Sequence, residues 1–321
     1  SSTGKYALRR PTCTTEGHRR GIISRPSSPA TTLADTVVTM RILVTNDDGI
    51  DSVGLHELAR TMVDLGEVTV VAPDQEYSGF GAALGPVHLI RPEVHRARVE
   101  GVETAWTVSG PPALCVMYAN LRVFGEPFDL VVAGINPGSN VGRSVYHSGT
   151  VGAALTARNG GISGVAVSQA VSEWGVEGQG VNEVLDQQLW GTAAGVAHTA
   201  VAALIADLPA TPKVLNINVP NLPVEEVKGW RFTQVGGPPP RTLASARLEP
   251  KPGHEDSFRV RMSWGDPANL PAGSDGGAVM AGFVSLTWLG GLAAVSCDDA
   301  HGVGEALDHL LAEAARPQSS L

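Results

Sequence analysis

The sequence predicts an α/β protein with a Rossmann-like, three-layer, doubly wound and mostly parallel sheet, followed by a C-terminal antiparallel hairpin extension. Three observations predict it. From Met40 onward, short β-branched runs alternate with longer helical stretches, which is typical of a parallel sheet with helices on both faces. The chain has 321 residues, of which 43% are hydrophobic and 17% charged, enough to form one large or two ordinary domains. Beyond Pro220, alternating stretches between Pro/Gly-rich segments predict antiparallel strands.

The elements of the core follow from this pattern in chain order. Residues 41–45 (RILVT) predict a buried strand, and residues 53–65 predict an amphipathic helix with Leu55, Leu58, Ala59 and Met62 on one face. A strand at 67–72, a glycine-rich loop at 78–85, an irregular extended stretch, a strand at 104–108 and a helix around 113–123 come next. The core then continues with a strand at 128–133, a loop at 134–147, a helix starting near 148–151, a strand at 164–168 and a helix near 189–208. We expect this core to span residues 40–220.

The remaining segments are expected to lie around that core. Residues 170–186 are polar and contain glycine, which predicts an insertion loop. Strands are predicted at 230–234, 258–263 and 282–289, with the Pro/Gly-rich segments 236–240 and 267–277 between them and a final helix at 304–315. We therefore expect a hairpin extension over residues 221–300 and a C-terminal helix and tail over residues 301–321.

Residues 1–39 predict a disordered leader. Six basic side chains outnumber Glu16 and Asp35 there, and Ser, Thr and Pro fill the rest without a period: Lys5, Arg9, Arg10, Arg19, Arg20 and Arg25. Met40 directly precedes the first strand, which leaves open an upstream translated extension, a cloning remnant or a targeting tail.

Charge and cysteine content exclude several classes of partner. The chain carries 23 basic and 32 acidic side chains and a formal net charge of −9, so no nucleic-acid partner is expected. No run approaches the roughly 18 apolar residues of a membrane span, and no signal-peptide core is present, so we expect a cytoplasmic protein without a membrane partner. Cys13, Cys115 and Cys297 are odd in number and lack CxxC spacing, which argues against a disulfide framework or a zinc knuckle.

Three segments that follow strands carry the candidate chemistry, because ligands of open α/β sheets lie beyond the carboxyl ends of the strands. Asp47 and Asp48 follow the first strand, where adjacent carboxylates can bind a hard divalent cation or simply form an Asp-Gly turn. Residues 72–79 (APDQEYSG) could bring a hydroxyl or carboxylate to the same edge, or form a solvated loop. The third segment, 134–142 with 148–151, places glycines before a helix start, which suits an anion, although Ser148 also fits a plain N-cap. Their coincidence at one edge predicts a metal and phosphate site.

Other single residues and motifs offer weaker signals. His147 could serve as a general acid beside the phosphate loop, although a lone loop histidine is more often incidental. Cys115 fits a small core residue. The GxSxG elbow, the Walker A motif and HExxH are absent from the sequence, which disfavours three common enzyme classes.

At these residues the sequence resembles the SurE family of survival-protein phosphatases, which are metal-dependent 5′/3′-nucleotidases. The resemblance spans Met40 to about Leu289. It depends on five motifs: RILVTNDDGI at 41–50, VVAPDQEYSG at 70–79, DLVVAGINPGSNVG at 129–142, HSGTVGAAL at 147–155 and LNINVPNLP at 215–223.

The resemblance implies a site and a reaction. Asp47, Asp48, Ser78 and Asn136 would be the ligands of one divalent cation per subunit, most simply Mg²⁺ or Mn²⁺, with Asp47 and Asp48 also acting in catalysis. The phosphate would be bound by Gly138, Ser139, Asn140, Ser148, Gly149 and Thr150. The expected substrates are nucleoside 5′-monophosphates, with 3′-monophosphates as an extension. The family also implies a homodimer or homotetramer in which the extension at 221–300 contacts a neighbouring subunit.

Three positions depart from the usual pattern of the family. Leu114 and Arg143 stand where acidic residues are usual, and Thr156 stands where Glu is common. The four expected metal ligands are intact, so we expect metal binding to persist. The three changes leave undecided which substrate is preferred and which contacts join the subunits. Two alternatives therefore remain. One is a phosphatase for another small phosphate, such as a sugar phosphate or a short polyphosphate, and the other is a nucleotide-binding protein without turnover.

Overall fold

The computed structural model describes residues 39–89, 91–171, 185–238, 243–266, 268–294 and 301–314. The predicted leader lies outside this part of the chain except for Thr39, and so does most of the predicted insertion loop.

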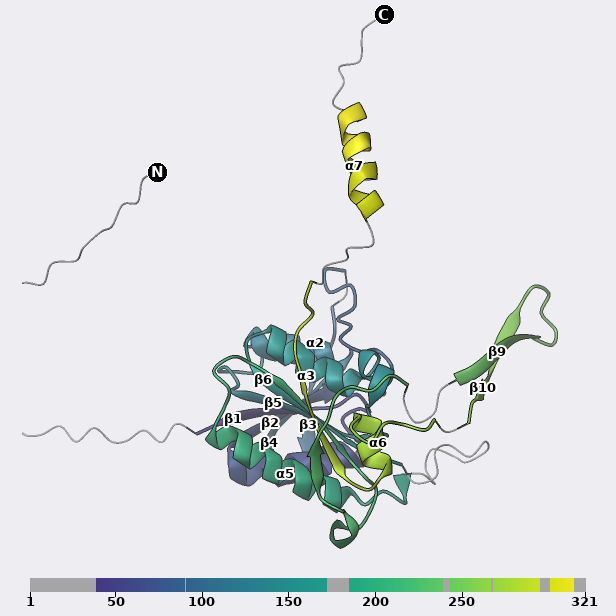
Figure 1. Cartoon of the computed structure of the whole chain (residues 1–321). Coiled ribbons are helices and arrows are strands. Elements are labelled where there is room, and N and C mark those ends of the chain that lie inside the picture. Colours follow the sequence, from purple (N-terminus) through teal and green to yellow (C-terminus); the bar gives the residue numbers. More distant parts are fainter. Residues whose placement is uncertain are drawn as a thin grey trace, which may run out of the picture. The chain divides into compact units, whose positions relative to one another are not determined.

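The main sheet of the described chain has nine strands in the order β3-β4-β2-β1-β5-β6-β7-β11-β8 (Figure 1). The strands are β1 (Arg41–Thr45), β2 (Glu67–Pro73), β3 (Val94–Val99), β4 (Val102–Val108), β5 (Leu130–Pro137), β6 (Ser163–Gln169), β7 (Val214–Val219), β8 (Trp230–Phe232) and β11 (Val284–Leu289). Every neighbouring pair from β4 to β7 is parallel, whereas β3 is antiparallel to β4 and β11 is antiparallel to β7. The predicted doubly wound, mostly parallel sheet is confirmed.

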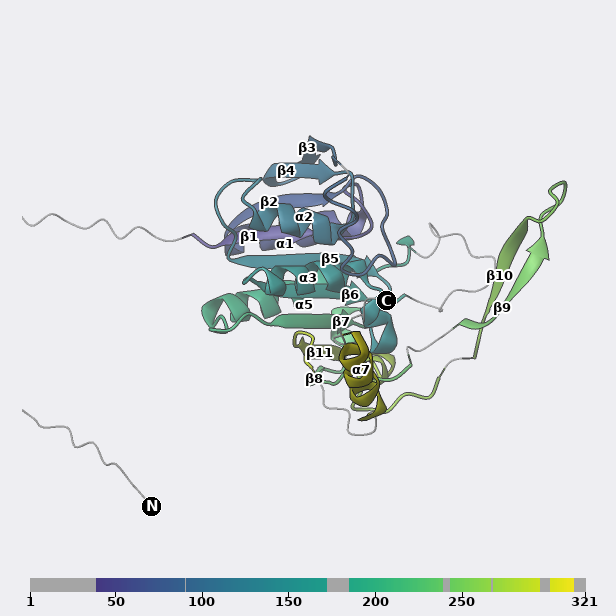
Figure 2. The same cartoon turned by 90° about the horizontal axis from the view of Figure 1, so that it is seen from above.

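Helices cover both faces of this sheet, so the core has three layers (Figures 1 and 2). The helices α1 (Val53–Met62) and α5 (Trp190–Ala206) cover one face, and α2 (Pro112–Asn120) and α3 (Gly149–Asn159) cover the other. Strand β1 serves both cores because its side chains alternate between the faces. Ile42 and Val44 belong to the core with α1, whereas Leu43 belongs to the core with α2. No helix within the described ranges is long and apolar enough to cross a bilayer.

The strand order reverses between β1 and β5. The chain runs from β1 to β2 on one side and from β5 to β6 and β7 on the other. In doubly wound sheets, this reversal opens a crevice beyond the carboxyl ends of the two strands, where ligands bind. Asp47 and Asp48 follow β1, and Asn136 lies near the end of β5, so the fold brings two of the three predicted segments to this crevice.

The sheet continues beyond residue 220. Strand β11 pairs antiparallel with β7, and β8 pairs parallel with β11. A short helix, α6 (Asp275–Met280), precedes β11. Strands β9 (Leu243–Pro250) and β10 (Phe258–Trp264) pair antiparallel in a two-stranded sheet of their own. An antiparallel hairpin in the C-terminal extension is thus confirmed, although its first strand was not among the predicted ones. The C-terminal helix α7 runs from His301 to Ala314, beginning three residues earlier than predicted.

Several local predictions are wrong. Strands β3 and β9 and helix α6 were not expected, and the predicted loop at 134–147 contains the end of β5 and a 3₁₀ helix, Gly142–Tyr146. Strands β8 and β11 occur where expected, but they pair parallel with each other. The chain between them includes the β9–β10 hairpin and α6, and a long connection of this kind lets two strands run in the same direction.

Candidate active site

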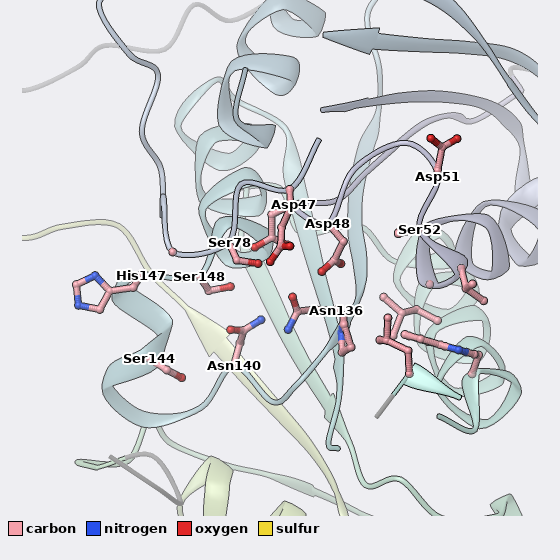
Figure 3. A pocket seen from close by; sticks show the side chains of 18 residues that line it. Asp47, Asp48, Asp51, Ser52, Ser78, Asn136, Asn140, Ser144, His147 and Ser148 are labelled. Carbon is pink, nitrogen blue, oxygen red and sulfur yellow. The ribbon is translucent and has the colours of Figure 1, made fainter. Parts of the chain in front are cut away.

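A cavity of about 640 Å³ opens at the reversal point between β1 and β5 (Figure 3). Its walls come from the turn after β1, the loop after β2, the end of β5 with the loop beyond it, and the start of α5. Six of the predicted site residues line it: Asp47, Asp48, Ser78, Asn136, Asn140 and Ser148. The structure therefore brings together all four predicted metal ligands and two of the predicted phosphate contacts.

Asp47 is held by the start of α3. Its Oδ1 accepts a hydrogen bond of 2.5 Å from the Thr150 hydroxyl, and only 3% of the residue is exposed. Gly149 permits this approach, because a Cβ at that position would lie 2.7 Å from Asp47 Oδ2. Burial raises the pKa of Asp47 above its usual value, although hydrogen bonds from Thr150 and from backbone groups at the helix start oppose the rise.

One carboxylate oxygen of Asp48 has no hydrogen-bond partner among the described residues. Its Oδ2 is buried and accepts no hydrogen bond from any described residue. Burial, and then the charges of Asp47 and Glu76, raise the pKa of Asp48 to about 8. An unpaired buried carboxylate oxygen next to a second carboxylate is stabilised by a cation, so the residues present fit a divalent metal.

Ser78 and Asn136 complete the candidate ligand set. Figure 3 shows Ser78 beside the two aspartates, with Asn136 facing them across the cavity. The Asn136 Nδ2 donates to the Gly138 carbonyl at 2.6 Å, which fixes the side chain in place. Carboxylate, hydroxyl and amide oxygens suit Mg²⁺ or Mn²⁺. Since no three His, Cys, Asp or Glu side chains of the described chain gather into a metal cluster, a cation here would need the hydroxyl and the amide as well as the carboxylates.

Asn140 sits in a buried polar network that sequence reasoning missed. Its Nδ2 donates to the Ser168 hydroxyl at 2.9 Å, and its backbone N–H donates to Asn218 Oδ1 at 2.8 Å. Its carbonyl accepts from Asn216 Nδ2 at 2.9 Å and from Asn218 Nδ2 at 3.2 Å. The available signal was the pair of asparagines in LNIN, because polar side chains inside a fully buried strand need partners.

Comparisons with known proteins identify the family of the chain. The family model of survival protein SurE matches residues 42–239. The chain belongs to the SurE family. It is 36% identical over 255 residues to the 5′-nucleotidase SurE of Alkalilimnicola ehrlichii, covering 77% of this chain and 88% of the relative. It is 37% identical over 253 residues to the 5′-nucleotidase SurE of Legionella pneumophila, covering 77% and 90%. The crystal structure of the SurE protein from Aquifex aeolicus matches with a TM-score of 0.64 at 28% identity, covering 84% of this chain and 99% of that one.

Four residues expected to bind phosphate in this SurE-family site do not line the cavity: Gly138, Ser139, Gly149 and Thr150. Thr150 is fully buried and its hydroxyl is bonded to Asp47, and Gly149 packs on the same carboxylate. Ser148 is the N-cap of α3, since its Oγ accepts from the backbone N–H of Val151 at 3.1 Å, and it also lines the cavity. The start of α3 thus contacts Asp47 directly.

The three residues that depart from the usual SurE pattern lie in the core, at the surface and within α3. Leu114 is fully buried in the core beneath α2, and Arg143 is exposed. The Thr156 hydroxyl donates to the Gly152 carbonyl within α3. Cys115 is fully buried, and burial raises the pKa of its thiol, as expected for an inert core cysteine.

The cavity also has lining residues outside the predicted metal-ligand and phosphate-binding sets. Asp51 and Glu76 add carboxylates to it, while Val53, Leu185 and Trp190 give it an apolar wall. His147 lines the cavity with an exposed side chain, in keeping with its sequence assignment as a loop residue. Figure 3 shows Asp51 and Ser52 on one side of the aspartates and Ser144 and His147 on the other.

Proposed function

We propose that this SurE-family chain is a metal-dependent phosphomonoesterase that hydrolyses nucleoside 5′-monophosphates to nucleoside and phosphate. The observation that carries the proposal is the meeting of Asp47, Asp48, Ser78 and Asn136 in one cavity at the reversal point of the sheet. The relatives named 5′-nucleotidase SurE support the choice of reaction. Nucleoside 3′-monophosphates are included in the same proposal as secondary substrates.

Asp47, Asp48, Ser78 and Asn136 would hold one divalent cation per subunit, Mg²⁺ or Mn²⁺. When bound, such a cation neutralises charge on phosphoryl oxygens and lowers the pKa of water. The unpartnered Oδ2 of Asp48 and the raised pKa of both aspartates support this assignment, because ionised carboxylates in this setting need a positive charge nearby.

The residues around the metal ligands supply the remaining steps. Asp47 or Asp48 would accept a hydrogen bond from the attacking water and orient it. The Asn140 amide has two N–H groups and uses one on Ser168, so the other is available to a phosphoryl oxygen. The Ser148 hydroxyl accepts from Val151, so its proton is free to donate into the cavity. Donors aimed at the charge that develops on the phosphoryl group accelerate its transfer.

The apolar wall of the cavity favours a nucleoside as the leaving group. Val53, Leu185 and Trp190 line the same cavity as the aspartates, and an indole ring offers a face on which a nucleobase can stack. A sugar phosphate or a short polyphosphate has no aromatic group to place there. This wall therefore favours a nucleotide over the other small phosphates.

The remaining assignments are part of the same proposal. We expect a cytoplasmic homodimer or homotetramer with no nucleic-acid or membrane partner, in which residues 221–300 form the subunit contact. The exposed apolar side chains of the β9–β10 hairpin support that contact.

The test is phosphate release from nucleoside 5′- and 3′-monophosphates, ribose 5-phosphate and tripolyphosphate, with Mg²⁺, Mn²⁺ or EDTA. Asp47→Asn is expected to reduce the rate by at least about 100-fold, because even partners of metal ligands cost about 10- to 100-fold when they are lost. Asp129→Asn, which alters a carboxylate outside the cavity, is the matched control. Silence of the folded, metal-loaded wild type on every nucleotide would reject the proposal, and tight nucleotide binding without release would indicate a binding protein.

A further inference from the structure

Asp275 is a buried carboxylate bound by three backbone N–H groups. It is 1% exposed and is the first residue of α6. Its Oδ2 accepts from the Gly142 N–H at 2.8 Å, and its Oδ1 accepts from Gly236 at 3.0 Å and from Gly276 at 2.8 Å. Hydrogen bonds to an ionised acceptor are roughly twice as strong as neutral ones. This side chain therefore joins the start of α6 to two segments that are distant in the sequence, at Gly142 and at Gly236.

The contact with Gly142 matters because residues close to Gly142 in the chain line the cavity. Gly142 follows Asn140 by two residues and begins the 3₁₀ helix Gly142–Tyr146. Asn140, Ser144, His147 and Ser148 all line the cavity, so the peptide that Asp275 holds lies within the segment that forms this wall. Asp275 itself is not among the lining residues.

A second contact holds the same segment. The backbone N–H of Arg143 donates to the Gly237 carbonyl at 2.9 Å. Gly142 has a φ of +55°, and a Cβ there would lie 2.7 Å from the Pro238 carbonyl oxygen. Asp275 holds Gly236, and residues 236–238 lie against Gly142 and Arg143. The C-terminal part of the chain thus clamps two adjacent peptides of the cavity wall.

The candidate metal ligands lie outside the clamped segment. Asp47 and Asp48 follow β1, Ser78 lies in the loop after β2, and Asn136 belongs to β5. Asn136 is fixed by its own contact with Gly138. A change at Asp275 is therefore expected to act on the phosphate side of the site and to spare the metal side.

We propose that Asp275 is a positioning residue that holds the wall carrying Asn140, Ser144 and Ser148 in the geometry that binds the phosphoryl group. This inference rests on the proposed phosphomonoesterase function. The experiment measures two binding events separately, since the residues proposed to bind inorganic phosphate and those proposed to bind Mn²⁺ belong to different walls of the cavity. A residue that only supported the fold would change both together.

The experiment compares Asp275→Asn with the wild type and with Asp266→Asn, a matched control at an exposed aspartate in the same part of the chain. Calorimetry with Mn²⁺ alone gives the metal affinity, and kinetics with AMP give kcat, KM and the inhibition constant of inorganic phosphate. Asp275→Asn is expected to lower kcat/KM and weaken phosphate inhibition by at least about tenfold, because a charged hydrogen-bond acceptor is lost. The Mn²⁺ affinity is expected to stay within about twofold, and Asp266→Asn is expected to match the wild type.

A milder variant keeps the test decisive if Asp275→Asn fails to fold. In Gly236→Ala the new Cβ would lie 3.1 Å from Asp275 Oδ1, which crowds the carboxylate without removing it. It is expected to change the same phosphate readouts in the same direction by a smaller factor. Wild-type phosphate affinity in both folded variants, or loss of Mn²⁺ and phosphate binding together, would overturn the inference. A wild type that binds both ligands but releases no phosphate would reject the proposed function, while calorimetric titration of the Mn²⁺-loaded variants with inorganic phosphate would still compare their phosphate affinities and test Asp275.

Discussion

Asp48 has an ionisable carboxylate in a buried environment that disfavours its charged form. Burial, Asp47 and Glu76 raise its pKa to about 8, far above the value of an unfolded aspartate, and its Oδ2 has no partner among the described residues. Because the folded pKa exceeds the unfolded one, the contribution of this group to stability is fully present below pH 4. It is lost as the pH rises to about 8. The metal-free protein is therefore predicted to become less stable across this range.

The corresponding prediction is that Asp48→Asn stabilises the metal-free protein at pH 8.5 and has little effect at pH 4.5. The neutral amide cannot ionise, so the cost of a buried charge disappears. Thermal unfolding in EDTA at both pH values measures this, with an expected rise in Tm of a few degrees at pH 8.5 only. Glu126→Asn, at an exposed site, serves as the control for loss of a negative charge. An equal effect of Asp48→Asn at both pH values would contradict the assigned cause.

Trp190 is predicted to contribute to substrate choice. Stacking of a base on an aromatic ring contributes about 1–3 kcal/mol, which corresponds to about 5- to 150-fold in affinity. Trp190→Ala should raise KM for AMP by a factor in this range and leave kcat/KM for ribose 5-phosphate, which has no base, nearly unchanged. Steady-state kinetics on the two substrates measure the difference, and Trp288→Ala, at a tryptophan outside the cavity, is the control. An equal loss on both substrates would show that Trp190 supports the cavity without contacting the base.

At the scale of elements, the sequence predicted the strands and helices that have a clear local residue pattern, and it missed those that do not. Strand β1 was predicted with its observed bounds, because a short β-branched run has one good solution in a parallel sheet. Strand β3 was missed because it is an edge strand, and His95, Arg96 and Arg98 interrupt its apolar pattern. Helix α6 was missed because it is short and begins Asp-Gly-Gly, which resembles a turn.

The residues of the candidate site also fall into those that local sequence pattern predicts and those that it does not. Asp47, Asp48, Ser78 and Asn136 each follow or end a predicted strand, so the sheet rule alone brings them to one edge. Asp275 could not be found in this way, because its partners Gly142 and Gly236 lie 133 and 39 residues away in the chain. Contacts of this kind depend on the tertiary fold, for which a single sequence carries no local signal.

The junction between α3 and Asp47 gives a prediction at the scale of elements. Gly149→Ala would place a Cβ 2.7 Å from Asp47 Oδ2 and is expected to weaken Mn²⁺ binding by about tenfold or more, in line with the loss of a partner of a metal ligand. Gly191→Ala in α5 is the control, because a Cβ there meets nothing within 4 Å and alanine favours a helix. Mn²⁺ titration by calorimetry compares the two variants. Wild-type affinity in Gly149→Ala would show that Asp47 tolerates displacement.

At the scale of the whole molecule, the β9–β10 hairpin has one apolar face and one polar face. Phe258, Val260, Met262 and Trp264 alternate along β10 with Arg259, Arg261 and Ser263. Val260 lies opposite Leu248 of β9, and these two residues are 59% and 66% exposed. An isolated two-stranded hairpin is marginally stable in water, and an apolar face of this kind usually marks an interface. The hairpin is therefore expected to be covered by a second copy of the chain.

This expectation is tested by placing the same charged residue on either face of β10. Val260→Asp puts a carboxylate on the apolar face and is predicted to shift the protein to a smaller assembly, because a buried unpaired charge costs far more than one in water. Ser263→Asp makes the same change of charge on the polar face, three residues away, and is predicted to leave the assembly intact. Light scattering coupled to size-exclusion chromatography at several concentrations gives the masses. A wild-type chain that stays monomeric throughout, or equal dissociation of both variants, would show that this face does not join subunits.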